Sequence, residues 1–366
     1  MGILILGLLG STVLGILWYL VFCVHRFGLL QRLKARRPVL SWLIAIGCVS
    51  LLGLFALYNI PTLLIVVVHL ALAFLLTNLI GRIAKRCKRP LSADLCGAAA
   101  IALTAVYLGI GCFFAFHIFE TDYTLTTEKP LARDLRIVEI ADSHLGITLN
   151  GARFTAEMQR IDALEPDLVV VVGDFVDDDS DRDDMLAACR ALGSLKTTYG
   201  VYFVFGNHDT GYFSGRDFST DDLMNALNEN HVTVLRDESV LLDDSVYLIG
   251  RRDRSMPDRR SASELMADLD PSRYCIFLDH QPNDYENEAA AGADLVLSDH
   301  THGGHIFPAG QIGLLIGAND ALYGLSQRGG TTFLVTSGTS GWAIPIKTGT
   351  FSEFVVIDLS STASEA

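Results

Sequence analysis

The sequence predicts a two-part α/β protein, in which four membrane-spanning helices precede a soluble domain of alternating strands and helices. Half of the 366 residues are hydrophobic and the mean hydropathy is +0.35, which is too apolar for an ordinary soluble chain of this size. The apolar residues are also unevenly spread. Long uninterrupted runs fill residues 1–119, whereas shorter ones alternate with polar segments from residue 135 onward.

Four runs in the first 119 residues contain no Asp, Glu, Lys or Arg. They cover residues 2–24, 39–60, 61–80 and 95–119, and each is close to the ~20 residues that a helix needs to cross ~30 Å of hydrocarbon. A cleaved signal peptide is the alternative for the first run, but that run lacks a basic start and an obvious small-residue cleavage site. We therefore expect four retained transmembrane helices.

The loops between these runs indicate an orientation. Two of them are basic and carry Arg26, Arg32, Lys34, Arg36 and Arg37, and then Arg82, Lys85, Arg86, Lys88 and Arg89. Because Lys and Arg are enriched in cytoplasmic loops, we expect a multi-pass protein of the cell membrane whose residues after Phe119 are extracytoplasmic. The predicted division is a membrane region at 1–119, a polar connector at 120–134 and a soluble domain at 135–366.

The charge of the soluble part limits its partners. Residues 120–366 hold 18 Lys and Arg against 41 Asp and Glu, a net charge near −23. This charge disfavours a nuclease or any broad nucleic-acid surface, but a small anion can still bind where metal ions supply positive charge. Only Cys189 and Cys275 lie beyond the membrane region, so there is no disulfide framework, and only a single bridge stays open.

The soluble domain alternates two kinds of pattern. Buried strands are expected at 135–141, 168–172, 201–205, 246–250, 274–278, 294–298, 331–337 and 353–359. Helical spacing of apolar residues is found near 152–164, 183–195, 220–230, 261–269 and 285–291. This alternation is typical of a layered α/β domain.

Polar side chains follow five of these strands, at the strand ends where α/β folds place their ligand sites. The segments are "DSHLG", "GDFVD", "GNHD", "DHQP" and "SDHTHGGH". They supply Asp142, His144, Asp174, Asp177, Asn207, His208, Asp209, His280, His300 and His302. One such cluster alone is typical of a capped turn, but five in succession indicate a metal site.

The ordered motifs D-x-H, G-D-x-x-D, G-N-H-D, a single His and H-x-H resemble the calcineurin-like metallophosphoesterase superfamily over residues 134–359. The ending "SGTSGWAIPIKTGTFSEFVVIDL" and the membrane region more narrowly resemble its bacterial membrane-associated members. The resemblance implies an αββα two-sheet sandwich with its site at strand ends. It also implies two metal ions, one held by Asp142, His144, Asp174 and His302, and the other held by the bridging Asp174 with Asn207, His280 and His300.

The charge of this ligand set suits phosphate chemistry. Two divalent ions and two carboxylates leave a net charge of about +2, which attracts a phosphate anion and favours a metal-bridging hydroxide near neutral pH. Mixed His, Asp and Asn ligands fit Mn, Fe or Zn better than Ca or Mg, which prefer oxygen. The expected enzyme is a dinuclear-metal-dependent phosphohydrolase.

The resemblance assigns two catalytic positions and shows two departures. His208 would contact the substrate phosphate and protonate the leaving oxygen, with Asp177 orienting it; Asp209 would either support His208 or cap the turn. Asp299 stands where relatives have Gly, and His305 where they have Gln. Asp299 would either hydrogen-bond a ligand imidazole or tolerate a positive φ. His305 would either contact the substrate or, as we expect, take a Gln-like hydrogen-bonding role.

The substrate class is inferred from a missing arginine. Serine/threonine phosphatases of this superfamily continue G-D-x-x-D with Arg-Gly, whereas this chain reads "GDFVDDDS". This difference favours phosphodiester or phosphoanhydride bonds, and membrane tethering points to lipid or cell-envelope substrates. The basic segment 251–261 is either a headgroup site or a solvated loop. The alternatives are a phosphomonoesterase or protein phosphatase, and a non-catalytic membrane sensor that retains the fold.

Overall fold

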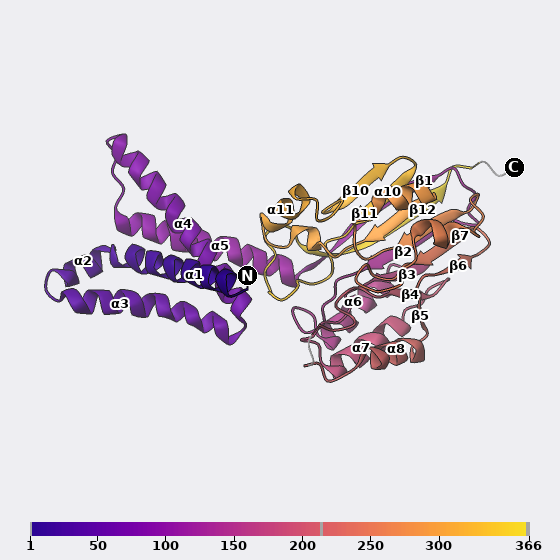
Figure 1. Cartoon of the computed structure of the whole chain (residues 1–366), viewed down its shortest axis with the longest axis horizontal. Coiled ribbons are helices and arrows are strands. Elements are labelled where there is room, and N and C mark those ends of the chain that lie inside the picture. The colour runs from indigo at the N-terminus through magenta and orange to yellow at the C-terminus, as the bar shows by residue number, and fades with distance from the viewer. Residues whose placement is uncertain (1, 213–214, 364–366) are drawn as a thin grey trace. The chain divides into compact units, whose positions relative to one another are not determined.

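The computed structural model describes residues 2–212 and 215–363. It divides into two compact units, Met1–Gly111 and Cys112–Ala366 (Figure 1). The first unit is helical. Its elements are α1 (Gly2–His25), α2 (Gly28–Lys34), α3 (Pro38–Ser50), the 3-10 helix η1 (Leu51–Leu57), α4 (Ile60–Arg86) and most of α5 (Ala93–Phe116).

The apolar helices of the first unit agree with a membrane location. In the part of the chain that the structure describes, three segments are long and apolar enough to cross a membrane: Pro38–Leu57, Ile60–Arg86 and Ala93–Phe116. Gly10–His25 and Gly28–Lys34 pass the same test only together, and they are bent by 83° at their junction. The described residues thus contain three candidate spans, or four if this bent pair is one span, where the sequence predicted four.

The second unit begins with a six-stranded sheet. Its order is β1 (Ile118–Thr127), β12 (Ser352–Ser361), β2 (Leu135–Ile140), β3 (Leu168–Val172), β4 (Val201–Val204) and β5 (Val232–Val234). Strands β2 to β5 are parallel, and the unbroken valines of β3 are buried on both faces, as parallel strands between two layers require. Helices α6 (Gly151–Asp162), α7 (Arg182–Gly193) and α8 (Thr220–Glu229) pack on one face.

A second six-stranded sheet packs on the other face of the first. Its order is β10 (Gly324–Arg328), β11 (Thr331–Val335), β9 (Leu295–Ser298), β8 (Tyr274–Leu278), β7 (Val246–Gly250) and β6 (Glu238–Leu242). Aliphatic side chains of both sheets form one core, and α9 (Ala262–Met266) and α10 (Tyr285–Ala291) cover the outer face. The result is the expected helix-sheet-sheet-helix layering, with α6 to α8 and the second sheet on opposite sides of the first (Figure 1).

All eight predicted strands and all five predicted helices of the soluble domain form, within a few residues of their expected ends. The connector expected at 120–134 is the main correction. Residues 118–127 form the edge strand β1, parallel to β12 with Ile118 opposite Ser352. Its side chains alternate between more and less buried positions, so it lacks the continuous apolar run by which the inner strands were predicted.

Candidate metal centre

The polar segments that follow β2, β3, β4, β8 and β9 meet at one edge of the sandwich. Three groups of His and Asp side chains there have ligand atoms within 4.8 Å of one another. These groups are Asp142, His144 and His302; His144, Asp177 and His208; and Asp174, His280 and His300. All six of the His and Asp residues expected to bind metal are thus brought together, although they span 160 residues of sequence.

Asp174 belongs to the third group and also approaches His144 of the first group. Its Oδ2 is 3.1 Å from Nε2 of His280 and 3.8 Å from Nε2 of His144. Its Oδ1 accepts a hydrogen bond of 2.7 Å from the backbone N–H of His208. This backbone bond fixes the carboxylate and brings the turn that carries Asn207 beside it.

Several donor atoms of the centre are buried and lack a hydrogen-bond partner. They are both carboxylate oxygens of Asp142, Nε2 of His144, Nε2 of His280 and Nδ1 of His302. A buried polar atom without a partner costs about 1–3 kcal/mol, so such a concentration indicates atoms built to hold a cation. Imidazole nitrogens and carboxylate oxygens together fit divalent transition ions.

Hydrogen bonds on the far side of each ring orient two of the imidazoles. Nδ1 of His280 lies 2.9 Å from the carbonyl oxygen of Val172, and Nδ1 of His144 lies 3.0 Å from Oδ2 of Asp177. Because Nδ1 donates to an oxygen in both residues, the Nε2 lone pair is left for a metal ion. This is the arrangement that metal-ligating histidines usually show.

The turn after β4 supplies an amide, a histidine and a carboxylate. Nδ2 of Asn207 donates to the hydroxyl of Tyr212 at 2.9 Å, which leaves the amide oxygen as the donor suited to a metal ion. The side chain of Asp209 accepts from the backbone N–H groups of Phe175, Val176 and Gly206 at 2.8–3.0 Å. Asp209 therefore caps two ligand loops, the second of the two roles expected for it.

The backbone at the centre is locally strained. Asp142, His144, Asp174, His300 and His302 all have a positive φ, between 35° and 62°, a region that side chains other than glycine rarely adopt. Strain of this kind persists only where the surrounding structure enforces it, and it is concentrated at functional sites. Its presence at five of the seven expected ligands supports a functional role for this cluster.

Glycines allow the ligand loops to pack tightly. A Cβ on Gly206 would lie 2.2 Å from Oδ1 of Asp174, and one on Gly338 would lie 2.5 Å from Cβ of Asp142. Neither position has room for a side chain. The glycine of the G-N-H-D motif is thus required for the close approach of the loops that follow β3 and β4.

Burial sets the electrostatics of the donor set. Burial raises the pKa of Asp142 well above its ordinary value, and the neighbouring Asp299 adds to that rise. Burial also raises the pKa of Asp174, but contact with His280 and His144 outweighs it and holds that pKa well below the ordinary range. Burial lowers the pKa of His300 to about 4, which keeps its imidazole in the neutral form that binds metals.

The two departures from the family pattern both lie against the centre. Asp299 is fully buried. Its φ is negative, so the alternative that it tolerates a positive φ is wrong. An added Cβ on Gly338 would be 2.8 Å from Oδ2 of Asp299, which places the carboxyl beside Asp142. His305 packs its ring 5.3 Å from that of His302.

Sequence reasoning did not identify two aromatic side chains beside His208. The ring of Tyr212 lies 4.9 Å and that of Trp342 5.5 Å from the His208 ring, and both aromatic residues are about half exposed. Trp342 belongs to the quoted ending of the domain, but nothing in a single sequence shows that this segment returns to the G-N-H-D turn.

The basic segment 251–261 is largely paired within the protein. Arg251 is buried and contacts Asp279, Asp284 and Glu288 at 2.7–3.3 Å. Arg252, Arg259 and Arg260 also contact carboxylates or backbone carbonyls. A headgroup site built from this island is therefore not supported.

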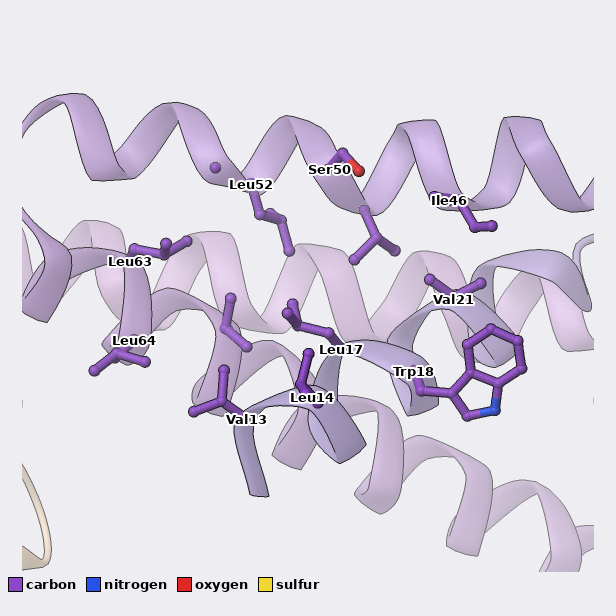
Figure 2. Close-up of a pocket in the computed structure, with 13 residues that line it drawn as sticks. Val13, Leu14, Leu17, Trp18, Val21, Ile46, Ser50, Leu52, Leu63 and Leu64 are labelled. Carbon is purple, nitrogen blue, oxygen red and sulfur yellow. The ribbon is translucent and has the colours of Figure 1, made fainter. Parts of the chain in front are cut away.

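A separate pocket in the helical unit is lined by no charged side chain and no histidine or cysteine. Figure 2 shows side chains of α1, α3, η1 and α4 around a space of about 490 Å³. Apart from the hydroxyl of Ser50 and the indole N–H of Trp18, the lining is apolar. Such a pocket has neither metal ligands nor a group that binds phosphate.

Comparisons with known proteins agree with the geometry. A family model described as calcineurin-like phosphoesterase matches residues 135–304, and a second, described as YwiC-like protein, matches residues 2–108. A metallophosphoesterase from Aquifex aeolicus is 34% identical over 213 residues, which cover 56% of this chain and 78% of the relative. The chain therefore belongs to the calcineurin-like metallophosphoesterase family.

Further relatives include membrane proteins. A metallophosphoesterase from Helicobacter pylori strain J99 is 31% identical over 59% of this chain and 57% of the relative. A transmembrane protein with metallophosphoesterase domain from Bos taurus is 30% identical over 72% of this chain and 62% of the relative. The chain spans about three-fifths of the length of these two relatives. The solved structure of a dimetal phosphatase from Danio rerio matches with a TM-score of 0.36 at 13% identity, over 56% of this chain and 88% of that one.

Proposed function

We propose that this chain is a membrane-anchored phosphohydrolase that binds two divalent ions and cleaves phosphodiester or phosphoanhydride bonds. The observation that carries the proposal is the convergence of buried, unpaired donor atoms from Asp142, His144, His280 and His302 around Asp174. Two divalent ions bound there would supply the positive charge that attracts a phosphate and would activate water as the nucleophile.

The protein's own side chains would do the remaining work. Nδ1 of His208 is engaged by Asp177, so Nε2 is the nitrogen left to donate a proton to the leaving oxygen. The carboxylate of Asp177 stays ionised because its contacts with His144 and His208 outweigh burial and hold its pKa well below the ordinary value. It would therefore stabilise the protonated imidazole before transfer.

Two features support a diester or anhydride with an apolar part, such as a lipid or cell-envelope substrate. The positions after Asp177 are Asp178 and Asp179, which lack the arginine that grips a phosphomonoester dianion. The half-exposed rings of Tyr212 and Trp342 border His208 and can pack against an apolar leaving group.

The basic loops at 26–37 and 82–89 support an extracytoplasmic catalytic unit.

The test is hydrolysis by the full chain in detergent, stripped of metal and then loaded with Mn, Fe or Zn. We expect kcat/KM for bis-p-nitrophenyl phosphate to exceed that for p-nitrophenyl phosphate by about tenfold in at least one metal form. Faster cleavage of the monoester would instead support the phosphomonoesterase alternative. A folded, metal-loaded chain that cleaves neither ester would support the non-catalytic sensor.

A further inference from the structure

An uncharged, exposed segment follows directly after the loop that carries His300 and His302. Residues 306–319, "IFPAGQIGLLIGAN", contain no Asp, Glu, Lys or Arg, in a part of the chain whose net charge is near −23. We call this segment the apolar lobe. It contains helix α11 (Ala309–Leu315), in which no residue is buried.

The apolar lobe presents large hydrophobic side chains to the surroundings. Leu315 is 86% exposed and Ile316 is 74% exposed, and Phe307, Ile312 and Leu314 are each about half exposed. Scattered exposed hydrophobic residues are normal, but a contiguous group of this size marks a surface that contacts another apolar phase. The question is which apolar phase covers it.

The position of the lobe within the second unit answers this question. The last turn of α5, from Cys112, belongs to that unit, and one residue, His117, separates α5 from β1. Ser352 Oγ donates to the carbonyl oxygen of Ala115 at 3.0 Å, and the ring of Phe351 lies 6.3 Å from that of Phe114. The end of a candidate membrane helix is thus fastened to the start of β12.

The apolar lobe is attached to the same corner. The backbone N–H of Phe307 donates to Oγ1 of Thr348 at 3.0 Å, three residues before Phe351. Because a helix that crosses the bilayer ends at its surface, the corner that holds the end of α5 must lie at that surface. The lobe is attached to this corner, so the bilayer is the nearest apolar phase to it.

We propose that the apolar lobe inserts its exposed side chains into the interfacial region of the membrane that α5 spans, and so seats the catalytic unit on the bilayer. Uncharged segments rich in Leu, Ile and Phe bind at this depth by burying apolar area. The proposal requires α5 to be a membrane span, but it does not depend on which phosphate ester is cleaved.

Membrane seating would be transmitted to the metal centre. A Cβ on Gly310 of the lobe would lie 2.3 Å from Cα of Gly304, so α11 and the ligand loop are in backbone contact. The lobe and this loop therefore move together. A lobe fixed in the interface would hold the loop that carries His300 and His302 close to the lipid headgroups.

The test is a depth measurement on the full chain in lipid nanodiscs. The exposed Cys48, Cys87 and Cys112 are replaced by Ser, and Leu315→Cys is labelled with a nitrobenzoxadiazole dye. The matched control is Leu241→Cys on β6, the strand at the opposite edge of the second sheet from β10, where the side chain is also exposed. Metal content equal to that of the unsubstituted chain shows that each variant is folded.

We expect lipids with a nitroxide near the headgroup to quench the Leu315 label at least fivefold more than the Leu241 label, and aqueous iodide to show the opposite order. Equal iodide quenching at both positions would overturn the proposal. Protection from iodide without quenching by the nitroxide lipid would also overturn it, and would indicate that a protein surface, such as a second copy, covers the lobe. Ile316→Cys gives a second reading at a neighbouring position.

Discussion

Oδ1 of Asp177 lies 2.9 Å from Nδ1 of His208. The other oxygen of the same carboxylate lies 3.0 Å from Nδ1 of His144. One buried acid therefore orients both a candidate metal ligand and the candidate proton donor, and the rings of these two histidines are 5.0 Å apart. Substitution of His208 can therefore distinguish a loss of proton donation from a loss of metal binding.

The first prediction concerns His208→Ala. We expect this substitution to lower kcat for bis-p-nitrophenyl phosphate by about 10²–10⁴-fold, the usual contribution of a general acid, and to leave the metal content unchanged. His208 is grouped only with His144 and Asp177, and it is absent from the two groups made entirely of expected ligands. Turnover and metal content should be measured on the same preparation, with the exposed His231→Ala as control. Loss of the metal ions together with activity would contradict the assignment.

The second prediction concerns Asp299→Gly, which restores the residue usual in the family. Asp299 and Asp142 flank Gly338 and are both fully buried, so the carboxyl of Asp299 should hold that of Asp142 in place. We expect the affinity for Mn²⁺ to fall by about 10-fold or more, as for other groups that orient a ligand.

Competition with a chelating dye measures this affinity, and Asp268→Gly, at an exposed position, is the matched control. Unchanged affinity and turnover in Asp299→Gly would show that the aspartate is a neutral replacement.

The third prediction concerns Arg251→Met in the paired basic segment. The guanidinium is buried against three acids, so its removal takes the counter-charge from Asp284 and the buried Glu288, whereas Asp279 keeps Arg259. We expect the free energy of unfolding of the second unit to fall by about 3–5 kcal/mol. Arg254→Met, at an exposed position, should change it by less than about 0.5 kcal/mol. Thermal unfolding of the full chain compares the two, and similar losses would refute the structural role of Arg251.

Much of the fold was predictable because apolar and polar residues are cleanly separated along the chain. The unbroken valines of β3 predict a strand that is buried on both faces. The alternating residues of β1 carry no such signal, because a strand with one solvated face resembles a polar connector. Its pairing with β12 joins positions more than 200 residues apart, and a single sequence does not show such a pairing.

The candidate site was predictable for a related reason. Residue types suited to metal binding follow strand after strand, which indicated a site containing Asp142, Asp174 and His280, and the resemblance to the family then assigned each its role. Contacts between the loops could not be predicted from the sequence. The three backbone hydrogen bonds of Asp209, the ring of Trp342 beside His208 and the exposure of the apolar lobe all depend on how distant segments fold together.

The most direct test of the two-ion centre is the metal content of Asp174→Asn, because Asp174 approaches a histidine of each donor group, 3.1 Å from His280 and 3.8 Å from His144. The full chain loaded with Mn²⁺ should contain about two ions per chain by elemental analysis, whereas Asp174→Asn should contain fewer than one and show no hydrolysis of bis-p-nitrophenyl phosphate. Two ions per chain with unchanged turnover in Asp174→Asn would contradict the account.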